Sequence, residues 1–325
     1  MRRTRVVVAG LGDAGLLTAV RLARHADLEV VGISSQPGLV SGQELGLRLA
    51  DPARWARDYW VGFERFSGLD PVRTVHGVIE ACDPQARTLT VRRADGAIGE
   101  ETYDHLVVAT GVRNGFWRTP ELRDADAVAS SLRAAHERLV ASGSVAVVGG
   151  GAAAVATAAQ LATRSAVRVD LYFPGERALP QHHPRVWSRV AARLERLGVG
   201  LHAGHRAELP EHLDRIGEGP VRFTTGQAPA PADAVVWAVG RVEPNTAWAP
   251  SAWLDAAGFV VTDAELRVTG AEGVWAIGDV AAPAGDPLRS TARNRADGLL
   301  AANIRAAVDG RDPQSYAPEI GRAHV

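Results

Sequence analysis

The chain has 325 residues, yet it contains no lysine, only one cysteine and no apolar run long enough to cross a membrane. The absence of lysine excludes a lysine Schiff base and a phosphate-binding loop that depends on lysine. The single cysteine, Cys82, excludes an internal disulfide framework and an internal redox dithiol. We therefore interpret Cys82 as a small, buried, apolar residue.

An excess of charge of one sign is also lacking, since the formal net charge is only −1. A chain of this balance has no general attraction for nucleic acid or for an acidic membrane surface. The basic start, Met1 to Arg5, leads into an apolar run that Gly10 interrupts, which is typical of a first strand and not of a signal peptide. We expect a cytoplasmic protein with no nucleic-acid partner and no transmembrane segment, long enough for two domains.

The N-terminal part of the chain has the pattern strand, glycine turn, helix, strand. Val6 to Ala9 is fully apolar, and Gly10 to Gly15 follows it as a turn. Leu16 to Ala26 carries apolar residues on one helical face, and Leu28 to Ile33 is a second apolar run. A unit of this kind, about 30 residues long, is half of a dinucleotide-binding fold.

The same pattern returns later in the chain. Val145 to Val148 is a buried strand, Gly149 to Ala154 is a second glycine-rich turn, and an alanine-rich helix and the strand Val167 to Phe173 follow. Other segments also predict regular elements: strands at 73–79, 87–93, 103–110, 234–239 and 274–277, and helices at 131–141, 184–197 and 299–308. Strands that alternate with helices in this way predict a doubly wound α/β fold.

The first turn is a complete G-x-G-x-x-G motif between a strand and a helix. Gly10 permits the tight turn, Gly12 lets the backbone approach a pyrophosphate, and Gly15 lets the helix pack closely on the strand. The N–H groups of the helix N-terminus, at Asp13 and Ala14, favour phosphate. An acidic residue is expected at the end of the second strand, but Ser34 stands there and offers a hydroxyl without charge.

The second turn runs from Gly149 through Gly151 and Ala152 to Ala154, where alanine replaces the third glycine. The strand after it ends at Phe173, again without an acidic residue. Arg177 follows closely and could meet a 2′-phosphate, although most arginines are simply solvated. The choice between NADH and NADPH stays open on these residues.

Together with three further segments, these turns resemble the FAD-dependent pyridine nucleotide-disulfide oxidoreductase superfamily. The segments are the strand end Ala109-Thr110-Gly111, the run from Gly240 to Thr246 that is similar to a G-x-x-P-N-T motif, and Trp275-Ala276-Ile277-Gly278-Asp279-Val280. Five elements in the expected order, over residues 4 to 310, are far more specific than a single glycine motif.

The resemblance implies two nested Rossmann-like domains. An FAD-binding domain would consist of residues 1–112 and 241–319, and an NAD(P)H-binding domain, residues 113–240, would be inserted between them. The implied FAD contacts are Gly10, Gly12, Asp13, Ala14, Gly15, Ser34, Val78, Ala109, Thr110, Gly111, Gly278 and Asp279. The implied NAD(P)H contacts are Gly149, Gly151, Ala152, Ala154, Phe173, Arg177 and Gly240. No residue is assigned as a catalytic acid or base, and no metal is expected, because His182-His183 reads as a polar loop before a helix.

Within this superfamily, the lack of a cysteine pair argues against the glutathione-reductase and thioredoxin-reductase types. The chain looks more like the branch of type II NADH dehydrogenases, ferroptosis suppressors and apoptosis-inducing factor, or like ferredoxin-reductase-like enzymes. The chain departs from the quinone-linked relatives at two places: Ala156 replaces a frequent glutamate, and the segment 290–297 has no glutamine. The acceptor therefore stays open as a quinone, a small molecule or a protein redox carrier. The alternative is a nucleotide-bound signalling or binding protein of the same fold with negligible turnover.

Relatives in this family usually continue beyond the last helix with an interface segment, and we expect this segment to be truncated here. We interpret residues 320–325 as a non-native tail and expect that a full-length protein would form a homodimer. Peripheral association with a membrane stays open for the same reason.

Overall fold

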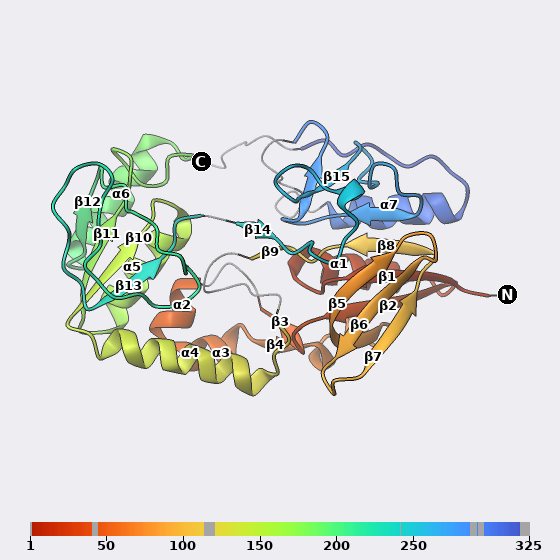
Figure 1. Cartoon of the computed structure of the whole chain (residues 1–325), viewed down its shortest axis with the longest axis horizontal. Helices are drawn as coiled ribbons and strands as arrows, with labels where there is room; N and C mark the ends of the chain where they lie inside the picture. Colours follow the sequence, from red (N-terminus) through yellow and green to blue (C-terminus); the bar gives the residue numbers. More distant parts are fainter. Residues whose placement is uncertain are drawn as a thin grey trace.

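The computed structural model describes residues 2–40, 45–113, 121–240, 242–286, 291 and 296–318. The chain forms two lobes that lie side by side, as Figure 1 shows. The large lobe contains a seven-stranded sheet, and the small lobe contains a four-stranded parallel sheet. This arrangement confirms the predicted α/β fold with two Rossmann-like units.

The sheet of the large lobe has the strand order β16-β8-β1-β2-β5-β6-β7. The first five of these strands are parallel, and the last two continue as an antiparallel meander. The bounds are β1 (Thr4–Ala9), β2 (Leu28–Ser34), β5 (Arg73–Asp83), β6 (Thr88–Arg93), β7 (Ile98–Thr102), β8 (His105–Val108) and β16 (Val274–Ala276). The central strands β1 and β8 are apolar on both sides, because alternate residues lie in two hydrophobic cores on the two faces of the sheet.

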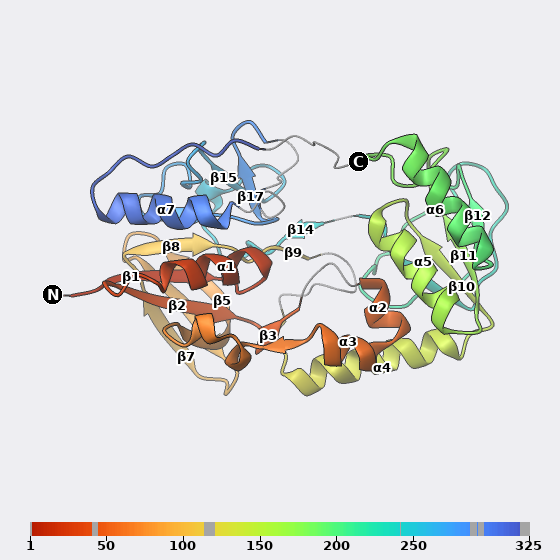
Figure 2. The ribbon, with the colours of Figure 1, turned by 180° about the vertical axis from the view of Figure 1, so that it is seen from behind.

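Two helices from opposite ends of the chain pack together on this sheet. Helix α1 (Asp13–Leu22) and helix α7 (Asp297–Val308) share one hydrophobic core with β1 and β16, and Figure 2 shows them side by side. The buried carboxylate of Asp297 binds the guanidinium of Arg21, which ties the two helices. The C-terminal part of the chain therefore packs on the same sheet as the first glycine turn.

The small lobe has the strand order β12-β11-β10-β13, with all strands parallel. Its elements are β10 (Ser144–Val148), β11 (Arg168–Tyr172), β12 (Gly200–His202), β13 (Ala234–Trp237), α4 (Ala125–Val140), α5 (Ala152–Arg164) and α6 (Pro184–Arg196). In the large lobe, β1 precedes the first glycine turn and lies between β2 and β8. In the small lobe, β10 precedes the second glycine turn and lies between β11 and β13. The strand order therefore reverses at β1 and at β10, and α/β sheets bind ligands at such a reversal.

Two short helices that the sequence analysis did not predict, α2 (Leu45–Ala50) and α3 (Pro52–Asp58), belong to the N-terminal half of the chain but pack on the small lobe. Figure 2 shows α2 beside α5. A Cβ at Gly46 would lie 2.6 Å from the carbonyl oxygen of Ala156, so the backbones of α2 and α5 touch without side chains between them. The position where the family often has glutamate is thus at a close helix–helix contact.

The lobes are joined where β9 (Val112–Arg113) pairs antiparallel with β14 (Glu243–Pro244). This crossing lies next to the boundaries predicted at residues 112 and 241. The remaining elements are β3 (Gly38–Leu39), β4 (Val61–Gly62), β15 (Val260–Thr262), β17 (Ala281–Pro283) and the 3₁₀ helices η1 (Phe63–Arg65), η2 (Ser67–Leu69) and η3 (Ser251–Trp253).

Several predicted elements are shorter or shifted in the structure. The first helix begins at Asp13 and ends at Leu22, because the last residues of the glycine motif already form its first turn. The predicted strand 103–110 is reduced to β8, since Ala109 and Thr110 leave the sheet to line a cleft. Cys82 is only partly buried and packs beside Tyr103. Within the described part of the chain, no helix is long and apolar enough to cross a membrane.

Candidate dinucleotide sites

A cleft of about 1030 Å³ opens at the carboxyl ends of β1, β2 and β8. It is lined by the first glycine turn, the ends of the neighbouring strands and the segment after β16. The predicted FAD contacts that line it are Gly10, Gly12, Asp13, Ala14, Ser34, Val78, Ala109, Thr110, Gly111, Gly278 and Asp279. Residues that are far apart in the sequence therefore meet at one cleft, at the reversal of strand order.

Each glycine of the first turn has a distinct geometric role. Gly10 has a φ of +103°, and a Cβ there would lie 2.4 Å from the carbonyl oxygen of Ala109. Gly15 does not line the cleft, and a Cβ there would lie 1.9 Å from the carbonyl oxygen of Gly10. At Gly12, by contrast, an added Cβ would meet nothing within 4 Å. Gly10 and Gly15 are thus needed for packing, whereas Gly12 leaves open space beside the cleft.

The helix that follows the turn begins without a side-chain cap. Gly12 is the N-cap of α1 and makes no capping hydrogen bond, and Gly151 is likewise the N-cap of α5. Helices α3 and α4 are capped by the aspartates Asp51 and Asp124. The first N–H groups of α1 and α5 are therefore left without a side-chain acceptor among the described residues, which is the condition for binding a phosphate.

The C-terminal part of the chain reaches the first turn through Gly278. Its φ is +84°, and a Cβ there would lie 3.4 Å from the Cβ of Ala14. Its N–H donates to Thr291 Oγ1 at 2.9 Å, and the Thr291 hydroxyl donates to the Gly278 carbonyl at 3.1 Å. This pair of bonds holds the following residue, Asp279, at the wall of the cleft.

The cleft also includes residues that the sequence analysis did not assign to it: Gln36, Glu80, Arg92, Arg113, Glu243, Asn245 and Trp248. Asn245 lies in the segment identified as G-x-x-P-N-T, so the motif was visible although the contact was not assigned. Arg92 donates to Glu80 at 2.6 Å across the β5–β6 pair. Arg113 reaches Asp214 of the small lobe at 3.3 Å. Two of the cleft's arginines are therefore neutralised by carboxylates.

The second glycine turn repeats the geometry of the first. Gly149 has a φ of +146°, and a Cβ there would lie 2.0 Å from the carbonyl oxygen of Ala238 at the end of β13. Gly151, like Gly12, has nothing within 4 Å of an added Cβ. Ala154 is fully buried beneath the turn, so this helix accommodates a methyl group where α1 has Gly15. Ala152, the next residue after the cap, begins α5.

The other residues predicted for this turn have different positions. Phe173 is buried and packs edge-to-face on Trp187, so its ring belongs to the core under the turn. Arg177 donates to the carbonyls of His182 at 3.0 Å and Pro180 at 3.2 Å, which braces the loop before α6. Gly240, after β13, has a φ of +74°. The structure thus gives Arg177 a structural role in the loop before α6.

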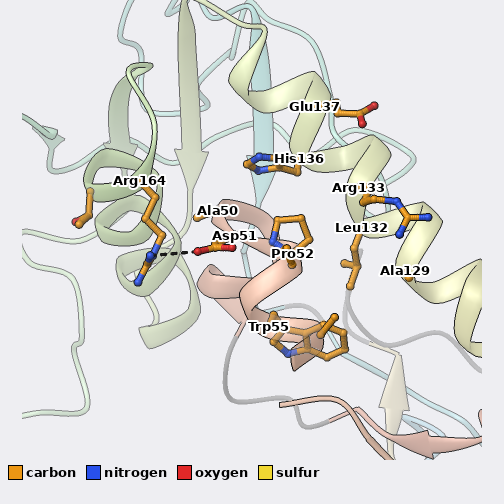
Figure 3. A pocket seen from close by; sticks show the side chains of 13 residues that line it. Ala50, Asp51, Pro52, Trp55, Ala129, Leu132, Arg133, His136, Glu137 and Arg164 are labelled. Carbon is orange, nitrogen blue, oxygen red and sulfur yellow. Dashed lines mark hydrogen bonds and ion pairs between the residues drawn. The ribbon is translucent and has the colours of Figure 1, made fainter. Parts of the chain in front are cut away.

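A second cleft, of about 630 Å³, is lined by α3, α4 and the C-terminal end of α5 (Figure 3). Asp51 and Trp55 lie on one side of it, and His136 projects from α4 on the other. His136 Nδ1 donates to the carbonyl of Leu49 at 2.8 Å, and Arg164 pairs with Asp51 at 3.2 Å. None of the predicted nucleotide contacts lines this cleft, and its bonds serve to fasten α2 and α3 to the small lobe.

Some predicted features can be placed and others cannot. His183 caps α6, because its Nδ1 accepts a hydrogen bond from the Arg185 N–H at 3.2 Å. The described residues contain no group of three or more His, Cys, Asp or Glu side chains that could hold a metal. Arg241, most of the segment 290–297 and the tail 320–325 lie outside the described residues.

Comparison with known proteins gives concordant matches. The model of the pyridine nucleotide-disulphide oxidoreductase family matches residues 4–298. The oxidoreductase ptaL of Pestalotiopsis fici is 29% identical over 296 residues, which cover 85% of this chain and 76% of that protein. The ferredoxin–NAD(+) reductase component of the anthranilate 1,2-dioxygenase system of Burkholderia cepacia is 30% identical over 289 residues, or 84% of this chain and 67% of that protein.

A solved structure has the same fold. The ferredoxin reductase for the CYP199A2 system from Rhodopseudomonas palustris superposes with a TM-score of 0.75 at 23% identity. The match covers 97% of this chain and 78% of that one.

Proposed function

Because the chain belongs to the pyridine nucleotide-disulphide oxidoreductase family, we propose that it oxidises NADH or NADPH through a bound FAD and passes the electrons to a separate acceptor. Membership of the family supports a general NAD(P)H oxidoreductase activity. The use of FAD, the position of each nucleotide and the acceptor are parts of the proposal.

The observation that carries the proposal is the open side of the first glycine turn. Gly12 faces empty space in a cleft of about 1030 Å³, and the N-terminus of α1 beside it has no side-chain cap. A pyrophosphate fits such a place because backbone N–H groups and the helix dipole favour negative charge. We assign FAD to this cleft, with Asp279 as a polar contact from the C-terminal part of the chain.

The second turn is the proposed site of NADH or NADPH. Gly151 also faces open space, and the N-terminus of α5 is likewise uncapped by a side chain. On this assignment, residues 113–240 form the NAD(P)H domain and residues 1–112 and 241–319 form the FAD domain. The two carbonyls that Arg177 already binds favour a role in the loop over selection of a 2′-phosphate.

When bound, a flavin supplies the ability to accept a hydride and to release electrons onward. The residues of this chain would bind and orient the two nucleotides and would exclude water. The turns at Gly10 and Gly149 would fix the pyrophosphates, and the paired residues of β9 and β14 would hold the two lobes in register. No side chain needs to act as an acid or base in a hydride transfer.

The acceptor is proposed as a protein redox carrier, a quinone or another small molecule. A carrier is supported by the name of the Burkholderia cepacia relative, which is a ferredoxin reductase component. A disulfide acceptor formed within the chain is excluded, since Cys82 is its only cysteine.

The proposal is tested by loading the purified chain with FAD and measuring NADH and NADPH oxidation with a set of acceptors: a quinone, a dye and a ferredoxin. We expect a yellow protein that oxidises at least one nucleotide faster with one of the acceptors than without any. A protein that binds no flavin after incubation with FAD, or that binds flavin but turns over with none of the acceptors, would contradict it.

A further inference from the structure

Helix α6 carries charge of one sign along its outer face. Its residues 185, 188, 189, 192, 193 and 196 lie on one side of the helix, because they follow the spacing of helical turns. All of them are exposed, whereas Leu194 on the other side is buried in the core of the small lobe. We call this side the arginine face, after its residues Arg185, Arg189, Arg193 and Arg196.

The charges of the arginine face are not balanced within the chain. Among the described residues, no aspartate or glutamate pairs with any of its arginines, although Arg196 Nε donates to the carbonyl of Ala192 at 3.1 Å. Other helices place a carboxylate four residues after an arginine, as in the pair of Arg54 with Asp58 on α3 and a similar pair on α7. On α6, the position four residues after an arginine is twice another arginine.

This arrangement lowers the stability of the helix. Like charges four residues apart on a helix repel each other. Arg185 also lies in the first turn, where the positive end of the helix dipole disfavours a cation. A helix that breaks these rules without compensation inside the chain indicates that the missing negative charges come from outside it.

The spacing of the charges indicates which kind of anion fits. Successive arginines of the arginine face are about 6 Å apart along the helix axis, since each residue adds about 1.5 Å. Carboxylates at every fourth position of another helix have the same spacing. Guanidinium and carboxylate groups match each other with two parallel hydrogen bonds. The side chains between the arginines, Ser188 and Ala192, are small and leave both flanks of each guanidinium accessible.

Other polyanions match this face less well. A helix that binds an anionic membrane inserts several large apolar side chains, but Val186 is the only exposed one on α6. A nucleic acid is attracted by a general excess of positive charge, but the net charge of the chain is −1. The charge complementarity of α6 is therefore restricted to a short acidic segment.

Helix α6 is also placed so that a bound partner would leave the nucleotide clefts open. Figures 1 and 2 both show it at the end of the small lobe that points away from the large lobe. None of the residues of the arginine face lines either of the two clefts. A partner on this face is therefore compatible with turnover.

We propose that the arginine face of α6 is a docking surface for an acidic helix of a partner protein, with carboxylates at every fourth position facing the guanidinium groups. This inference goes beyond the proposed function, because it uses neither nucleotide site. The docking would hold the protein beside its partner and would leave the rate of NADH or NADPH oxidation unchanged.

The experiment uses a fluorescein-labelled peptide of about 16 residues, an alanine-based helix with glutamate at every fourth position, and follows its anisotropy with the whole chain. The same peptide with glutamine in place of glutamate is the control ligand. We expect the glutamate peptide to bind and the double variant Arg189→Gln, Arg193→Gln to bind it roughly ten-fold more weakly. The affinity should also fall as salt is added, because exposed charges are screened.

A matched variant separates the arginine face from general charge. Arg206 and Arg222 are exposed on the same lobe and have no side-chain partner among the described residues. The double variant Arg206→Gln, Arg222→Gln removes the same charge and should bind the peptide as the wild type does. Neutralising Arg189 and Arg193 removes repulsion within α6, so the Tm of that variant should be equal to or above that of the wild type.

Three results would overturn the inference. The first is a wild-type protein that binds the glutamate peptide no better than the glutamine peptide. The second is an equal loss of affinity in the two double variants. The third is tighter binding of a single-stranded oligonucleotide or of phosphatidylglycerol vesicles than of the peptide, with the same dependence on Arg189 and Arg193, which would assign the face to a different class of anion.

Discussion

Thr110 and Asn245 bind each other through two reciprocal hydrogen bonds. Thr110 Oγ1 donates to the carbonyl of Asn245 at 2.8 Å, and Asn245 Nδ2 donates to the carbonyl of Thr110 at 3.1 Å. The Asn245 N–H adds a third bond, to the carbonyl of Gly111 at 3.0 Å. These contacts fasten the two segments where the chain crosses between the lobes, and both residues line the large cleft.

We therefore expect Asn245→Ala to lower both stability and FAD affinity. The loss of the side-chain amide removes one hydrogen bond and should reduce the free energy of unfolding by about 1 kcal/mol. Urea denaturation of the apoprotein measures this term. Thr110→Val removes the other side-chain bond, and the double variant should be less destabilised than the sum of the two single variants. Strict additivity would show that the two bonds do not act as one clamp.

Substitution by alanine should have opposite effects on the stability of the apoprotein at Gly10 and at Gly12. Gly10→Ala forces a Cβ against the Ala109 carbonyl at a positive φ, so the apoprotein should lose about 2 kcal/mol of stability or fail to fold. Gly12→Ala places its methyl group in open space, so the apoprotein should keep its Tm while FAD binding falls at least ten-fold, or about 1.4 kcal/mol. Thermal unfolding with and without FAD distinguishes the two. Unchanged FAD affinity in Gly12→Ala would argue against a pyrophosphate at this turn.

Cys82 is expected to have no part in electron transfer. Burial raises the pKa of its thiol, which keeps the reactive thiolate scarce near neutral pH. Cys82→Ala should therefore oxidise NADH or NADPH at the wild-type rate, and the wild-type thiol should react with iodoacetamide more slowly than in the urea-unfolded chain. A loss of turnover in Cys82→Ala would place the residue on the electron path.

His105, at the start of β8, should make stability depend on pH. Burial lowers the pKa of its ring below the ordinary value of 6.5, although Asp104 opposes this shift. The unfolded chain then binds the proton more readily than the folded one, so this contribution to stability is complete above the ordinary pKa and is lost as the pH falls below it. Urea midpoints between about pH 7 and about pH 5 should fall more steeply for the wild type than for His105→Gln. Equal slopes would contradict the assignment.

The parts of the fold that are local in sequence were predictable. At Gly10 and at Gly149, a strand, a glycine turn, a helix and a second strand follow one another in the sequence. This order depends on neighbouring residues, and the structure has the predicted order at both places. The parts that depend on distant contacts were not. Helix α2 is only six residues long, and its Gly46 packs against the backbone of Ala156. No hydrophobic periodicity within residues 45–50 indicates this contact.

The same distinction holds for the candidate sites. The predicted FAD contacts other than Gly15 line one cleft, because the motifs that carry them end neighbouring strands. Gln36 could not be found in this way, since the burial of its Oε1 without a partner among the described residues depends on the turn after β2, which His76 and Arg123 hold. Arg177 was predicted as a charge for a phosphate, but the carbonyls that it binds become its neighbours only in the folded loop.

We propose that electrons pass from a nucleotide at the Gly149 turn to a flavin at the Gly10 turn. Anaerobic titration of the FAD-loaded protein with NADH and with NADPH, followed by the visible flavin absorbance, tests this transfer. We expect the oxidised flavin band to disappear with at least one nucleotide, and Gly151→Ala to need roughly ten-fold more of it while keeping the same flavin content. A flavin that stays oxidised at every concentration of both nucleotides would contradict the account.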